Sequence, residues 1–92
     1  MEIKQKDDGK NGMFYVEQDG KVLAQMTYVW TGAERIIIDH TEVDDALRGQ
    51  SAGKQLVAKA VEFAREKSLK IIPLCPFAKS VFDKVAEYRD VL

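Results

Sequence analysis

The segment from Ile36 to Gly53 constrains this chain more than any other, because it joins an apolar strand to a long amphipathic helix. Three isoleucines lead into the tetrapeptide His40-Thr41-Glu42-Val43, and a short acidic loop then precedes the run RGQSAG at positions 48–53. A strand that feeds a glycine-containing turn at a helix N-terminus leaves backbone N–H groups unpaired, and a phosphate binds readily to such groups. The sequence therefore predicts a phosphate-binding turn at residues 48–53.

Length and composition limit the function classes that this chain can serve. A chain of 92 residues has room for one small domain, which we place at residues 1–92. Hydrophobic residues make up 46% of the chain and charged residues 32%, which is typical of a folded protein. The net charge of −1 gives no electrostatic reason for binding nucleic acid or an anionic membrane. No apolar run approaches the roughly 18 residues of a membrane-spanning helix, and the N-terminus lacks the apolar stretch of a signal peptide.

The single cysteine and the single histidine exclude two further kinds of site. Cys75 has no second cysteine with which to form an internal disulfide, so a reducing cytoplasm is the expected location. A structural zinc site needs a cluster of Cys and His ligands, which this chain does not offer. We therefore expect no metal.

The first half of the chain has the pattern of an antiparallel meander. Residues 1–12 are polar, with room for a short strand at Ile3, and an apolar run at Met13–Glu17 has the length of a strand. The Asp19-Gly20 pair predicts a two-residue hairpin. Strict alternation from Val22 to Trp30 then predicts a second strand whose even-numbered residues face the core. The third strand opens at residues 36–38 and is expected to be buried on both faces.

The second half predicts a helix, a strand and a helix. Apolar residues fall on one half of a helical wheel that begins at the RGQSAG turn and ends near Ser68. Lys70–Leu74 has the pattern of a short strand, which a helical crossover would place parallel to the third strand. A second helix is expected at about Pro76–Glu87, with proline in its first turn. The order βββ-α-β-α predicts an α/β sandwich with a mixed sheet.

The residues of the turn at 48–53, taken alone, allow two interpretations. Small residues at positions 49, 51, 52 and 53 would let phosphates approach the main chain, and Arg48 would add a charge. Alternatively, the segment is an ordinary helix start, with Ser51 as the N-cap and Gly53 present for close packing on the sheet. A nucleotide-binding P-loop is excluded, because the loop is one residue short and Gln55 stands where a Ser or Thr must bind magnesium.

Arg48-Gly49-Gln50-Ser51-Ala52-Gly53 resembles motif A of the GNAT superfamily of N-acetyltransferases, Q/R-x-x-G-x-G/A. Together with HTEV, the PLCPF turn and the terminal YRDVL, it makes nearly the whole chain similar to the short, stand-alone GNAT-like proteins of the YjdJ type. The resemblance implies acetyl-CoA as the cofactor, held by the main chain of Val43 and of the turn. The cofactor-binding residues would be Val43, Arg48, Gly49, Gln50, Ser51, Ala52, Gly53 and Lys54.

The sequence departs from the family pattern in two places. Ser51 occupies the position of the first glycine of the motif. Full-length members also carry two helices early in the fold and further strands after the last helix. Here the Asp19-Gly20 hairpin stands in place of those helices and the sequence ends at Leu92, so we expect an open acceptor side.

Acetyl transfer to an amine needs a general base, a donor for the developing oxyanion and an acid for the leaving thiolate. The Val43 amide is the candidate oxyanion donor. Glu42 is the first candidate for the base and His40 the second, since both lie on one face of the strand. In isolation, Glu42 would more often be a solvated carboxylate and His40 a structural hydrogen-bonding group.

Cys75 lies between a strand and a helix N-terminus, where the helix dipole lowers the pKa of a thiol. It could protonate the departing thiolate or attack as a nucleophile through an acetyl-cysteine. A small buried thiol with no chemical role is the alternative. Many members of the family use a tyrosine on the last helix as the acid. Phe82 falls in that region and Tyr88 comes late, so the acid role would pass to Cys75.

These features together predict a cytoplasmic acetyl-CoA-dependent N-acetyltransferase that is a monomer or weak dimer. Its acceptor would be a small amine, a lysine side chain or a protein N-terminus. The rival reading is a non-catalytic acyl-CoA-binding or protein-interaction module on the same fold. A third interpretation, nucleotide binding, would require ATP to stabilise the folded protein more than CoA does.

Overall fold

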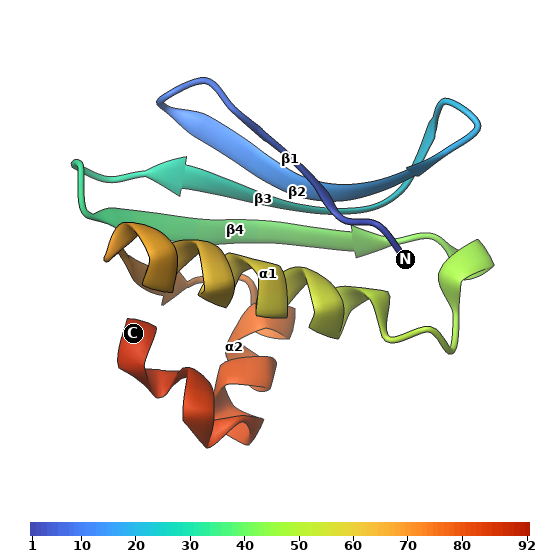
Figure 1. Cartoon of the computed structure of the whole chain (residues 1–92). Helices are drawn as coiled ribbons and strands as arrows, with labels where there is room; N and C mark the ends of the chain where they lie inside the picture. Colours follow the sequence, from blue (N-terminus) through green and yellow to red (C-terminus); the bar gives the residue numbers. More distant parts are fainter.

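The computed structural model describes all 92 residues and contains one five-stranded sheet with both helices on a single face (Figure 1). The strands are β1 (Lys4–Asp7), β2 (Asn11–Gln18), β3 (Lys21–Trp30), β4 (Arg35–Val43) and β5 (Lys70–Pro73). The helices are α1 (Ala52–Lys67) and α2 (Pro76–Lys84), with 3-10 turns η1 (Asp45–Leu47) and η2 (Ala86–Val91). No helix is both long and apolar enough to cross a membrane.

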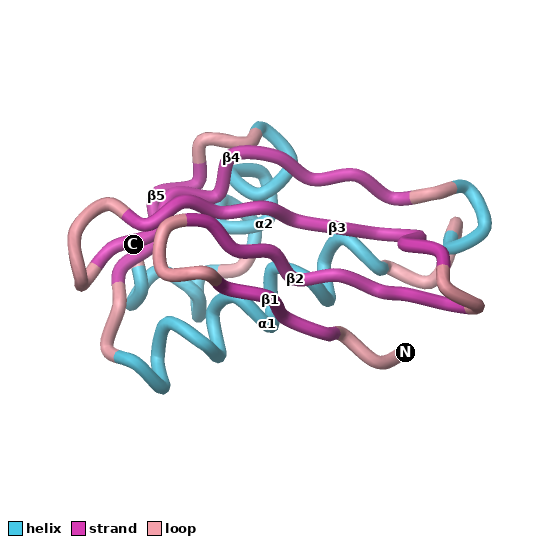
Figure 2. The backbone as a smooth tube through the Cα atoms, turned by 90° about the horizontal axis from the view of Figure 1, so that it is seen from above, coloured by secondary structure: helices cyan, strands magenta, loops and turns pink.

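The sheet is mixed, as predicted, and its strands lie side by side in sequence order (Figure 2). The first four strands are antiparallel, and β5 adds to β4 in parallel after the α1 crossover. The order ββββ-α-β-α has one strand more than the predicted βββ-α-β-α: the short N-terminal strand for which the sequence left room at Ile3 is present at Lys4–Asp7. That strand, β1, is polar, and tertiary contacts hold it in place. Gln5 donates to the hydroxyl of Tyr28 at 2.8 Å, and that hydroxyl donates to Asp7 at 2.6 Å.

The turn between β2 and β3 has the predicted conformation. Asp19 and Gly20 both have positive φ, at 52° and 76°, and the flanking Gln18 and Lys21 pair directly. Two consecutive positive φ values match the right-handed twist of the strands that such a turn joins. This hairpin brings β2 and β3 together over almost their whole length.

The alternation predicted for β3 is correct from Ala24 onward and wrong at its start. Ala24, Met26 and Tyr28 are buried, whereas Val22 is exposed and Leu23 is buried instead. The register of β2 on β3 shifts at Val16 and Glu17. A shift of one residue turns the following side chains to the other face of the sheet. It therefore leaves Val22 on the surface.

Helix α1 packs its apolar side on the sheet, as the wheel predicted. Its fully buried side chains on that side include Leu56, Val57, Ala60 and Ala64. The second helix is shorter than expected and ends at Lys84, after which η2 continues as a 3-10 turn. Arg65 of α1 fixes this segment through Asp90, with its Nη2 2.8 Å from the carboxylate.

The face of the sheet opposite the helices, which we call the outer face, carries no helix (Figure 1). For this reason Ile37 is only half-buried, although its neighbours Ile36 and Ile38 are fully buried. The expectation of a third strand buried on both faces was therefore wrong. Both turns of the β1–β2–β3 meander bend away from the helices (Figure 1), so the outer face is open and concave.

Candidate functional site

Strands β4 and β5 separate halfway along β4. Their pairing runs from Arg35 to Ile38, where Pro73 is the last partner. The amides of Leu74 and Cys75 then both donate to the Ile38 carbonyl at 3.0 Å, and the chain turns into α2. From Asp39 to Val43, β4 has only β3 as a neighbour. The result is a wedge between β4 and the start of α2.

The turn at residues 48–54 presents a row of unpaired donors to this wedge. Gly49 and Ser51 both have positive φ, at 83° and 55°. No protein acceptor contacts the amide N–H groups of Gly49, Ser51, Ala52, Gly53 and Lys54. The first turn of α1 has no acidic side chain. Its positive end is therefore available for an anion.

Ser51 does not have the capping role that the alternative reading gave it. It occupies the N-cap position in a left-handed conformation, and its side chain makes no capping hydrogen bond. A serine in this conformation adopts the backbone that glycine prefers. The turn thus keeps the conformation of a glycine-rich loop although serine occupies the position.

Between the wedge and the turn lies a hollow of about 380 Å³, which we call the wedge hollow. It is lined by Thr41, Val43, Ser51, Gly53, Lys54 and Phe77. A Cβ atom on Gly53 would come within 2.6 Å of the Phe77 ring. Gly53 therefore makes room for Phe77 of α2, whereas the alternative interpretation explained this glycine by close packing on the sheet.

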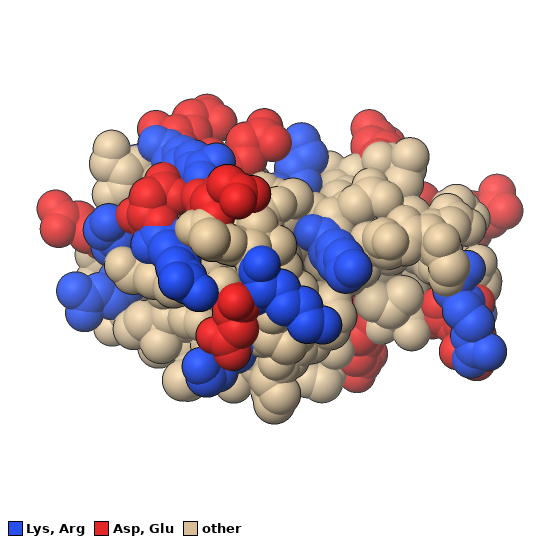
Figure 3. All heavy atoms as spheres, turned by 90° about the horizontal axis from the view of Figure 1, so that it is seen from below, with Lys and Arg blue, Asp and Glu red and all other residues tan.

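Of the basic side chains at the turn, Lys54 lines two hollows, whereas Arg48 pairs with an acidic side chain. Lys54 lines the wedge hollow and also a neighbouring hollow of about 210 Å³ that includes Lys84 and Tyr88. The guanidinium of Arg48 instead contacts Asp45 at 3.1 Å and is 81% exposed. The carbonyl of Gln50 accepts a bond from Gln55 at 2.9 Å. Lys and Arg side chains are spread over the helix-covered face (Figure 3).

Cys75 sits at the inner end of the wedge as the N-cap residue of α2. Its Sγ lies 3.4 Å from Oγ1 of Thr41, and the residue is buried. Burial by itself raises the pKa of the thiol. Hydrogen bonds from Thr41 and from the first-turn amides of Ala78 and Phe77 outweigh this and lower the pKa overall. The predicted environment of the thiol is therefore present.

His40 and Glu42 lie together on the outer face, on the opposite side of β4 from Thr41. Nε2 of His40 is 2.8 Å from Oε1 of Glu42, and both side chains are more than half exposed. Their cross-strand partners are Thr27 and Gln25. The structure thus pairs the two candidate bases as predicted, but it separates them from Cys75 by the thickness of the strand.

Sequence reasoning missed three residues of this region: Thr41, Phe77 and Lys84. Thr41 stood between the two candidate bases, and its alternation with them was the available signal that it faces Cys75. Phe77 and Lys84 become neighbours of the turn only through the packing of α2 on α1. No group of three His, Cys, Asp or Glu side chains is placed to hold a metal ion.

Residues 13–91 match the sequence family described as GCN5-related N-acetyl-transferase. The chain belongs to this family. The superfamily to which the sequence was similar is thus confirmed, and the mixed sheet with its α1 crossover is the family's fold.

Relatives of known sequence and structure agree with this assignment. The chain is 34% identical to "Protein NATD1" of Xenopus tropicalis over 79% of its own length and 68% of that protein. It is 44% identical to a GCN5-like protein of Staphylococcus aureus solved by NMR, with a TM-score of 0.77, covering 98% of this chain and 85% of that one. A predicted acetyltransferase of Clostridium acetobutylicum, solved with acetyl-CoA, shares the fold at 14% identity and a TM-score of 0.64, covering 80% of this chain and 55% of that one.

Proposed function

We propose that this protein transfers the acetyl group of acetyl-CoA to an amine. The observation that carries the proposal is the row of five unpaired amides at residues 49 and 51–54, beside the gap between β4 and β5. Such a row suits a pyrophosphate, which can accept several backbone N–H bonds at once. The bound acetyl-CoA of the C. acetobutylicum relative supports the same cofactor class.

The turn would bind the cofactor mainly through its main chain. The amides of residues 49 and 51–54 would hold the pyrophosphate, and Lys54 and Lys84 would neutralise the phosphates of the nucleotide end. The exposed backbone of β4 up to Val43 would pair with the amide groups of the pantetheine arm. In this arrangement the Val43 amide is the donor for the oxyanion that forms at the thioester carbonyl.

The outer face supplies the base. Glu42 accepts the proton of the amine, and His40 is within hydrogen-bonding distance to share it. The neutral nitrogen then attacks the thioester carbonyl carbon, a C–N bond forms and the C–S bond breaks. The carboxylate and the imidazole therefore act on the acceptor, which approaches from the side of β4 opposite the wedge hollow.

Cys75 supplies the proton for the departing CoA thiolate. It lies at the inner end of the wedge, and its lowered thiol pKa favours donation of its proton. The nitrogen loses its second proton to solvent as the amide forms, and the Cys75 thiolate regains a proton from solvent. An acetyl-cysteine intermediate is the competing route, and mass spectrometry of the protein during turnover distinguishes the two.

A ¹⁵N-HSQC titration with acetyl-CoA, free CoA and ATP tests cofactor binding. We expect residues 43, 49–54 and 75 to shift with both CoA species and not with ATP. Lys54→Ala and Lys84→Ala should each weaken binding several-fold, whereas Lys67→Ala, in the last turn of α1, should not. If saturating acetyl-CoA moves none of these amides, the proposal is wrong.

Turnover separates a transferase from a non-catalytic acyl-CoA-binding module. A transferase releases free CoA thiol when an amine is added, and Glu42→Gln should reduce that rate at least tenfold without changing the affinity for acetyl-CoA. A binding module would show the same HSQC shifts but no amine-dependent release of CoA from any amine tested. That result would replace transfer by binding as the function.

A further inference from the structure

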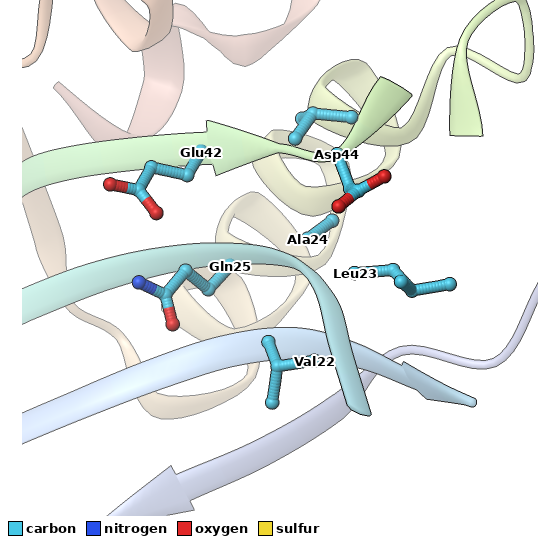
Figure 4. Close-up of a pocket in the computed structure, with 7 residues that line it drawn as sticks. Val22, Leu23, Ala24, Gln25, Glu42 and Asp44 are labelled. Carbon is cyan, nitrogen blue, oxygen red and sulfur yellow. The ribbon is translucent and has the colours of Figure 1, made fainter. Parts of the chain in front are cut away.

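A second hollow, of about 470 Å³, opens where β3 begins beside the end of β4, and we call it the acceptor hollow. Its lining includes Val22, Gln25, Glu42, Val43 and Asp44 (Figure 4). Val43 also lines the wedge hollow. Both hollows therefore border the residue whose amide is the proposed oxyanion donor, and in the proposed binding mode this residue lies at the reacting end of the cofactor.

The polar side chains of the acceptor hollow favour a cation. Glu42 and Gln25 are direct cross-strand partners, and their side chains extend in the same direction from the two strands (Figure 4). His40 contacts only Oε1 of Glu42, so Oε2 has no partner. The carboxylate of Asp44 adds a second negative group. No Lys or Arg lines the hollow.

The rest of the lining is aliphatic: Leu23 and Ala24 are buried, whereas Val22 and Val43 are exposed. Val22 is 39% exposed and Val43 is 42% exposed, two of the few large apolar side chains that remain on the surface. Val22 is there because the register shift between β2 and β3 turns it outward. An alkyl chain that covered Val22 would remove apolar surface from water, which stabilises the complex.

We propose that the acceptor is an aliphatic primary amine, with its ammonium group at Glu42 and Gln25 and its alkyl chain against Val22. A lysine side chain and a free alkylamine share this chemistry. An amino sugar does not, because its hydroxyl groups need more polar partners than the three that line this hollow. The inference rests on the proposed transferase function, and it names the substrate class.

Binding of the amine can be measured without the cofactor. We would titrate the ¹⁵N-labelled protein at constant pH with hexylamine, Nα-acetyl-lysine methylamide, glucosamine and hexanoate. We expect residues 22–25 and 42–44 to shift with the first two compounds only. Stronger binding of the lysine derivative than of hexylamine would identify a protein lysine as the source.

Substitutions test which residues contact the ammonium group of the amine and which contact its alkyl chain. Glu42→Gln should weaken hexylamine binding about tenfold, because the ammonium loses its countercharge. Val22→Asn should weaken it several-fold, because the alkyl chain loses an apolar wall. Leu74→Asn, which changes an exposed leucine outside the hollow, is the matched control and should bind as the unmodified protein does.

The two proposals fail in different ways. If acetyl-CoA shifts residues 49–54 but the alkylamines shift nothing, or glucosamine shifts the same amides equally, the aliphatic acceptor is excluded while acetyl transfer stands. If hexylamine binds as expected but acetyl-CoA moves nothing, the acceptor hollow is supported as an amine site and acetyl transfer is not.

Discussion

The Sγ atom of Cys75 lies 3.4 Å from the Oγ1 atom of Thr41, across the gap that opens between β4 and β5. The two residues are 34 positions apart in the sequence, and each belongs to an element that leaves the β4–β5 pairing at Ile38. The contact closes the inner end of the wedge and places a thiol of lowered pKa there.

Thr41→Val should raise the pKa of Cys75. The hydroxyl stabilises the thiolate, and valine of similar shape offers no hydrogen bond. The rate of iodoacetamide alkylation as a function of pH measures the change, and Thr41→Ser should restore the original profile. An alkylation profile that is the same in Thr41→Val as in the unmodified protein would show that the helix N-terminus alone sets the thiol pKa.

Ser51→Gly should stabilise the protein. Ser51 has φ 55° and no capping bond, so glycine relieves a left-handed backbone at no loss of contacts. We expect a gain of about 0.5–1 kcal/mol in the free energy of unfolding, measured by urea denaturation. Ser80→Gly, inside α2, is the control and should lower the free energy of unfolding, because glycine destabilises a helix interior. Destabilisation by Ser51→Gly would mean that the serine side chain has a role the structure does not show.

Gly12→Ala should destabilise the sheet. A Cβ atom at this position would lie 2.2 Å from Cζ of Tyr28, whose ring is 1% exposed and hydrogen-bonded at its hydroxyl. The ring has no space to move, so we expect a loss of about 1–3 kcal/mol from overpacking, measured by thermal or urea unfolding. Asn11→Ala, at an exposed neighbouring position, should change stability much less. Equal effects of the two substitutions would contradict the proposed clash.

Acid should release β1 before the rest of the sheet. Partial burial raises the pKa of Asp7, but hydrogen bonds from Tyr28, the Gly9 amide and Trp30 outweigh it and lower the pKa below the ordinary 3.8. The stability from Asp7 is therefore fully present above pH 3.8 and is lost as the pH falls through the lower folded value. Hydrogen exchange of the β1 amides against pH measures this loss. In Asp7→Asn the same amides should already be weakly protected near neutral pH.

The elements with strong local signals could be predicted from the sequence. The hairpin at Asp19-Gly20, the apolar side of α1 and the parallel placement of β5 follow from turn residues, periodicity and crossover geometry. The turn at residues 48–53 was also predictable as a segment, because its small residues and the helix that follows are contiguous. Local conformational preferences act within a few residues, so each of these features can be recognised from its own segment of the sequence.

Other features depended on residues that are distant in the sequence. β1 is polar and exists because Tyr28 and Trp30 hold Asp7. The exposure of Val22 follows from a register shift against β2, and the position of Gly53 is set by Phe77 of α2. The sequence by itself determined the order of elements from β2 onward and the chemistry available on β4. Only the tertiary structure decided which face each side chain of β4 occupies and which groups it meets there, because strand register and helix docking are set by packing of the whole core.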